Sequence, residues 1–133
     1  MTERIPVIEL RVALTVEDLD AAVAFYRDAL GLPVELSWDT PDGRGFVLQA
    51  GQATLELIDA AQADTIDRVE VGRRTAGPVR LALEVGDSEA TAGRLVDAGA
   101  ELLGGPVETP WGDRNARVRA PDGMQLTLFT RSG

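Results

Sequence analysis

The stretch Arg11-Val-Ala-Leu-Thr-Val-Glu-Asp18 is echoed in the second half of the chain by Arg80-Leu-Ala-Leu-Glu-Val-Gly-Asp87. Polar and apolar residues alternate in both stretches, which is typical of a strand with one buried face. Each ends on an aspartate that precedes an apolar stripe at helical spacing, and Gly31 and Gly99 follow these stripes. These signals predict a capped helix after each strand. The repetition of strand, cap and helix predicts two copies of one module.

Short alternating segments bounded by turn residues predict further strands after each helix. In the first half they cover residues 34–38, 45–49 and 53–58, and in the second half residues 101–103, 116–120 and 125–130. A loop at 104–115 carries Trp111 between a proline and a glycine.

The sequence therefore predicts an α+β fold of two βαβββ modules, a pseudo-twofold repeat. We expect their mixed sheets to curve into a cup with the helices on its outer face. Residues 1–60 form the predicted first module and residues 79–133 the second. A connecting segment at 61–78 joins them within one structural domain, and a single helical turn is predicted at its start, over Ala60–Asp64.

Composition excludes several classes of protein. The 133 residues, 44% hydrophobic and 26% charged, suit one globular domain. No apolar run approaches the ~20 residues of a membrane-spanning helix. The segment Met1–Pro6 lacks the apolar core of a signal peptide. We therefore expect a cytoplasmic protein without a membrane partner.

The sequence contains no cysteine and no histidine. Disulfides, thiol nucleophiles and imidazole metal ligands are thus excluded, and we expect no cofactor. Any catalysis would use carboxyl, tyrosyl or guanidinium groups. The net charge of −9 argues against nucleic acid as a partner. It would attract a cationic ligand, or it simply keeps the protein in solution.

Strand alternation assigns polar and charged side chains to the sheet face away from the helices, which is unusual for a face that only forms core. We add Trp38, which ends a strand and would otherwise pack as core, and Trp111, which could stack on a ligand or seal the cup. The predicted ligand-binding residues are Arg11, Thr15, Trp38, Thr54, Glu56, Arg80, Glu84, Trp111, Gln125, Thr127 and Phe129.

The charged residues of this set allow three interpretations. Glu56 and Glu84 would pair with Arg11 and Arg80, because a buried charge needs a partner. Alternatively, one arginine binds an acidic group of a ligand, or Glu56 is a catalytic acid or base whose pKa is lowered by the nearby cations. A hard cation held by the two glutamates is the third interpretation, which the two guanidinium groups oppose.

The segment Arg11–Tyr26, with Leu30-Gly-Leu32, resembles the first module of the vicinal oxygen chelate superfamily, which includes glyoxalase I, extradiol dioxygenases, methylmalonyl-CoA epimerase and bleomycin-resistance proteins. The second half resembles the same family through residues 80–85 and the hairpin at 120–128. The resemblance places the family's four metal-ligand positions at Arg11, Glu56, Arg80 and Thr127. Only Glu56 carries a ligand-type side chain, since a protonated arginine has no lone pair to offer.

The segment Thr109-Pro-Trp-Gly-Asp-Arg114 resembles the metal-free, antibiotic-binding branch of this family. The resemblance implies a metal-independent, non-catalytic protein that binds a small organic molecule, such as an antibiotic or a metabolite. It also implies a homodimer whose cups can be shared or swapped. Two alternatives remain open. One is an enzyme, either metal-dependent or based on Glu56, acting as a lyase, isomerase, epimerase or dioxygenase. The other is a structural dimer with an occluded cup.

Overall fold

Eight strands form one mixed sheet in the order β2-β3-β4-β1-β5-β8-β7-β6, in a computed structural model that describes residues 7–132. The first-module elements are β1 (Val7–Thr15), α1 (Leu19–Val23), a π-helical continuation η1 (Ala24–Ala29), β2 (Val34–Thr40), β3 (Gly43–Ala50) and β4 (Ala53–Ile58). The others are α2 (Ala60–Val71), β5 (Val79–Val85), α3 (Ser88–Asp97), β6 (Glu101–Glu108), β7 (Asp113–Arg119) and β8 (Gln125–Arg131). The first six residues of the predicted first module and the last residue of the predicted second module, 1–6 and 133, lie outside the described residues.

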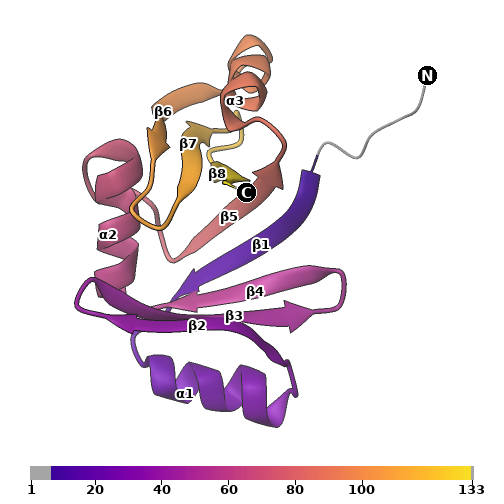
Figure 1. Cartoon of the computed structure of the whole chain (residues 1–133), viewed down its shortest axis with the longest axis vertical. Coiled ribbons are helices and arrows are strands. Elements are labelled where there is room, and N and C mark those ends of the chain that lie inside the picture. The colour runs from indigo at the N-terminus through magenta and orange to yellow at the C-terminus, as the bar shows by residue number, and fades with distance from the viewer. Residues whose placement is uncertain (1–6, 133) are drawn as a thin grey trace.

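The sheet is curved and not closed, which confirms the predicted α+β class (Figure 1). The two halves meet where β1 pairs antiparallel with β5. Within each half, β1 pairs parallel with β4, and β5 pairs parallel with β8. Ala13 of β1 faces Glu56 on one neighbouring strand and Arg80 on the other. The two echoed strands thus lie side by side at the centre of the sheet.

Helices α1 and α3 cover the convex face, as predicted. Their N-caps are the predicted aspartates: Asp18 accepts a hydrogen bond from the Ala21 N–H and Asp87 from the Ala90 N–H, each at 3.0 Å. The apolar strand residues pack under these helices in two clusters, one around Leu48 and Leu57 below α1 and one around Val85, Val118 and Leu128 below α3. The polar residues of the same strands therefore line the concave face.

Two local predictions were incomplete. The helix after Asp18 ends in π-helical turns, and the Leu30 N–H donates to the Phe25 carbonyl at 2.9 Å. This wider turn shifts the apolar stripe and leaves Leu30 exposed. The predicted loop at 104–115 is mostly strand, because β6 extends to Glu108 and β7 begins at Asp113. As an edge strand, β6 tolerates Pro106.

The connecting segment forms a helix much longer than the predicted turn. Asp59 caps α2 by accepting from the Gln62 N–H at 2.8 Å, and Gly72 ends the helix with φ +83°. The helix stands between the two ends of the curved sheet, with β2 and β3 below it and β6 above it in Figure 1. It contacts β3, β6 and β7. Helix α2 thus bridges the open side of the cup.

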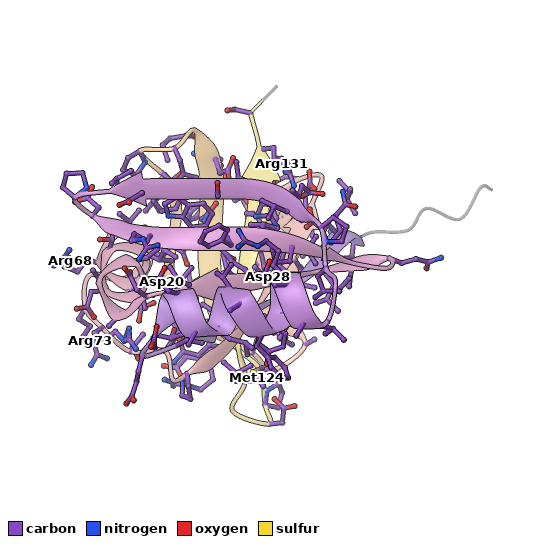
Figure 2. All side chains as sticks on the ribbon, turned by 90° about the horizontal axis from the view of Figure 1, so that it is seen from below. Asp20, Asp28, Arg68, Arg73, Met124 and Arg131 are labelled. Atoms are coloured by element: carbon purple, nitrogen blue, oxygen red, sulfur yellow. The ribbon has the colours of Figure 1, made fainter. Side chains whose placement is uncertain are left out.

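The side chains of α2 divide between solvent and the sheet. Figure 2 shows Arg68 of α2, and Arg73 just beyond the end of the helix, pointing outward. Asp67 and Glu70 are instead buried against the sheet. Asp67 Oδ1 accepts from Arg80 Nη1 at 2.7 Å and from Arg117 Nη2 at 3.1 Å, and Glu70 Oε1 accepts from Arg117 Nη2 at 2.7 Å. These contacts define the α2 ion-pair network: Asp67, Glu70, Arg80 and Arg117.

The other end of α2 is attached through a tryptophan. Trp38 Nε1 donates to Gln62 Oε1 at 3.0 Å. The Trp38 ring lies over Gly45 of β3, where a Cβ would overlap the ring atom Cζ2. Glycine is therefore required at position 45 because the indole occupies the space of a side chain.

We predict that G45A will destabilise the protein by about 1–3 kcal/mol, because the added methyl group must displace the indole or the strand. Urea unfolding measures the change. At Gly93 in α3, the space that a Cβ would occupy is open, with no atom within 4 Å. The control G93A should stabilise the helix by about 0.5–1 kcal/mol. Equal effects of the two substitutions would contradict this role for Gly45.

Arg117 is fully buried between two carboxylates. We predict that R117M will lower the free energy of unfolding by about 3–5 kcal/mol, because it leaves buried negative charge unpaired. The control R119M removes an exposed pair with Glu101 at 2.7 Å and should cost less than about 1 kcal/mol. Similar losses in the two variants would show that the α2 ion-pair network is not needed for stability.

Candidate functional site

The centre of the concave face is formed around Ala13, which is 1% exposed. Glu56 and Arg80 lie on the strands on either side of it, in register. Thr15 lies two residues further along β1, on the same face, and pairs with Ile58. Arg11 lies two residues before Ala13 and pairs with Thr54. The structure therefore places four of the predicted residues around Ala13 on one face of the sheet: Arg11, Thr15, Glu56 and Arg80.

Arg11 does not pair with either predicted glutamate. Its Nε donates to Glu9 Oε2 at 2.9 Å, and its guanidinium carbon lies 5.1 Å from the centre of the Phe129 ring. Glu84 pairs with Arg131 at 3.4 Å, and Arg131 also contacts Glu9 at 2.7 Å. The predicted pairing was wrong because β1 extends back to Val7, which places Glu9 on the same face as Arg11.

Arg80 also has an unpredicted partner. Its Nη1 donates to Asp67 of α2, whereas Nε and Nη2 are buried without a hydrogen-bond partner among the described residues. The whole residue is 3% exposed. The predicted pairing with Glu56 or Glu84 was wrong here because α2 reaches the concave face and supplies a closer carboxylate. One side of the Arg80 guanidinium nevertheless remains free.

Glu56 is the carboxylate that these pairings leave over. Within residues 7–132, no hydrogen bond or ion pair to its side chain is found, and its environment consists of burial and more distant charges. Burial raises the pKa of Glu56 above its ordinary value. Arg11 and Arg80 oppose this rise, whereas Glu70 and Glu9 add to it. The predicted lowering of this pKa was wrong because burial outweighs the effect of the two nearby cations.

The other predicted site residues fall into two groups. Near Glu9, Thr54 Oγ1 donates to that carboxylate at 2.6 Å, and Phe129 lies between two guanidinium groups. Near α2, Thr127 Oγ1 donates to Glu70 at 3.0 Å, and Gln125 Oε1 accepts from Arg117 at 2.9 Å.

The two tryptophans lie apart from this centre. Trp38 is attached to α2 through Gln62, so its N–H is occupied. Trp111 is 45% exposed in the turn between β6 and β7. A role for either in binding a ligand remains a prediction.

Sequence reasoning missed several residues of the concave face: Glu9, Asp67, Glu70, Arg117 and Arg131. A signal existed for Arg117, because Asn115, Arg117 and Arg119 follow the same alternation as the other inward positions. The spacing of Asp67 and Glu70 places both on one face of a helix, but the predicted helix stopped before them.

The four positions that correspond to metal ligands do not suit a metal ion. Two of them are guanidinium groups, which offer no lone pair. Arg80 and Thr127 are moreover bound to carboxylates of α2. The part of the chain that the structure describes contains no group of three or more histidine, cysteine, aspartate or glutamate side chains arranged to bind a metal. Glu56 is the one potential ligand among the four.

Solved structures with a similar fold include methylmalonyl-CoA epimerases. A variant of the Streptomyces coelicolor enzyme in complex with 2-nitronate-propionyl-CoA is 22% identical, with 98% of this chain and 100% of that chain covered and a TM-score of 0.68. The Mycobacterium tuberculosis enzyme is 20% identical, covering 100% and 94%, with a TM-score of 0.69. A hypothetical protein from Bacillus halodurans is 17% identical, covering 92% and 93%, with a TM-score of 0.69.

No curated protein sequence matches the chain significantly. Among the described helices, none has the length and apolar character needed to cross a membrane. A family model does match, over residues 10–128, and includes both modules and the helix between them. Together with the curved sheet of two βαβββ units, this match shows that the chain belongs to the Glyoxalase/Bleomycin resistance protein/Dioxygenase superfamily.

Proposed function

We propose that this protein binds a small organic molecule on its concave face, at Glu56, without a metal ion. The observation that carries this proposal is the Glu56 carboxyl, which has no partner among residues 7–132. The charged groups around it pair with one another: Arg11 and Arg131 with Glu9, and Arg80 with Asp67. A partly buried carboxyl without a partner is unfavourable in the free protein, and a ligand would supply the missing contact.

The position of Glu56 suits a binding site. It lies at the boundary between the α2 ion-pair network and the Glu9 cluster, which we define as Glu9, Arg11, Glu84 and Arg131. Unlike Arg80, Glu56 remains partly exposed. A ligand on the concave face can therefore reach it. An antibiotic or a metabolite is the class of ligand expected for such a site, and we propose a homodimer as the assembled form.

A second candidate is an enzyme that uses Glu56 as an acid or base, for instance an isomerase or lyase. The raised pKa of Glu56 favours it, because a carboxyl that titrates closer to neutral pH transfers protons more effectively. The epimerases of similar fold make this candidate chemically reasonable. Turnover that survives in E56Q would exclude it.

We predict that E56A, which removes the carboxyl group, will lose at least tenfold in affinity for any compound that stabilises the wild-type protein. A thermal-shift screen of antibiotics and metabolites identifies such compounds, since a ligand at 100 times its Kd stabilises by about 2.7 kcal/mol. The exposed Glu17 gives the matched control E17A, which should bind normally. The proposal fails if no compound binds, or if E56A binds as well as the wild type.

We also predict a characteristic pH dependence of stability. Since the pKa of folded Glu56 is raised above 4.5, its contribution to stability is intact below that pH and is lost as the pH rises toward the folded pKa. E56Q should therefore be more stable than the wild type at pH 7, with an advantage that shrinks toward pH 4. Urea unfolding across this range measures the difference.

Asp67 provides the opposite case. Burial opposes its ionisation, but hydrogen bonds from the Thr75 and Ala76 N–H groups and the charges of Arg80 and Arg117 outweigh it and lower the pKa of Asp67. D67N should therefore cost most at neutral pH, and its cost should decrease as the pH falls. An equal pH trend in E56Q and D67N would contradict the assignment of Glu56 as the unpaired group.

A further inference from the structure

We propose that the ligand is an organic acid whose carboxylate binds the free Nε–Nη2 side of Arg80, with Thr15 and Glu56 completing its coordination. This inference rests on the proposed function and names the ligand class of the same site.

The guanidinium group of Arg80 is bound on one side only. Its Nη1 is fixed by Asp67 at 2.7 Å, so the guanidinium group has a defined orientation. Nε and Nη2 are buried and have no partner among the described residues. These two N–H groups are parallel, and this side of a guanidinium binds both oxygens of a carboxylate. Unpaired buried donors are costly, so an occupant that accepts both hydrogen bonds would be favoured.

A second unpartnered group lies next to Arg80. Thr15 Oγ1 is also buried without a partner in the described part of the chain. The Thr15 N–H donates to the Pro78 carbonyl at 2.7 Å, which fixes β1 against the start of β5. Because Ala13 pairs with Arg80, Thr15 lies diagonally across from it on the same face. The free hydroxyl and the free guanidinium side can therefore serve one ligand group.

Glu56 lies on the opposite side of Ala13 from Arg80. A bound carboxylate would add negative charge beside Glu56 and favour its protonated form further, in the direction that burial already favours. A protonated Glu56 is a hydrogen-bond donor. It would then donate to the ligand instead of repelling it. An amine would instead place a third cation near Arg80 and Arg11.

The carboxylates of α2 leave one side of Arg80 unbound. Both Arg80 and Arg117 donate to Asp67 Oδ1, whereas Glu70 binds Arg117. Arg80 is therefore bound to these carboxylates through Nη1 alone. Because Arg80 is 3% exposed, we expect the ligand to enter along the partly exposed Glu56, with a rotation of that side chain.

The test uses the full chain labelled with ¹⁵N and follows the arginine Nε–Hε signals by NMR, together with the backbone amide signals, from which affinities of the wild type and of each variant are compared. Propionate, lactate and benzoate are the carboxylate probes, and propionamide, lactamide, benzamide and benzylamine are their uncharged or cationic counterparts. The conservative variant R80K retains the charge facing Asp67 but loses the Nε–Nη2 side. Its spectrum also identifies the Arg80 signal. R94K, in an exposed position on α3, is the matched control.

We expect at least one carboxylate to shift the Arg80 signal saturably, and to bind at least tenfold more tightly than its amide. R80K should weaken that binding at least tenfold, whereas R94K should not change it. If R80K does not fold, T15V and the wild-type Arg80 signal decide: a shift that saturates with carboxylates and is weakened in T15V supports the proposal.

Three results would overturn the inference. If amides or benzylamine bind in an E56A-sensitive manner while carboxylates leave the Arg80 signal unchanged, the proposed function stands and the ligand class is wrong. Carboxylates that bind R80K as tightly as the wild type also exclude this site. If neither the probes nor the screened library bind in a manner sensitive to E56A, the proposed function falls together with the inference.

Discussion

The carboxylate of Asp67, shared between Arg80 and Arg117, is the contact on which the concave face depends. It joins a helix from the connecting segment to strands β5 and β7. Glu70, one turn later, binds Arg117 and Thr127 in the same way. A buried ion pair of this kind adds little net stability, but it is costly to break one partner at a time. Its effect is therefore to fix where α2 lies.

Once α2 is fixed, the second half of the concave face acts largely as a polar core. The side chains of Arg117, Thr127 and Asn115 are bound to Glu70, and Gln125 is bound to Arg117 and to Thr75. A polar sheet face is thus not a binding site throughout. Among the described residues, the groups of this face without a partner include Glu56, one side of Arg80 and the Thr15 hydroxyl.

The sequence was sufficient to predict which strand residues line the concave face, but not which of the charged side chains pair with one another. Alternation along each strand is local, so the inward positions of β1, β4, β5 and β8 followed from the residues alone. Which carboxylate meets which arginine depends on tertiary placement. Glu9 lay before the predicted start of β1, and Asp67 lay beyond the predicted helical turn. Both errors concern element boundaries, and each hid the true partner of a central arginine.

The same pairing explains why the site differs from the four-ligand metal centre that the family resemblance implies. Where the resemblance places four ligands, this chain has two arginines that need carboxylates, and it supplies them from Glu9 and from α2. Each arginine is neutralised without Glu56. If Glu56 formed an ion pair with either arginine, its carboxyl would not be available to a ligand. The helix between the modules therefore separates the structural carboxylates from the one that is available to a ligand.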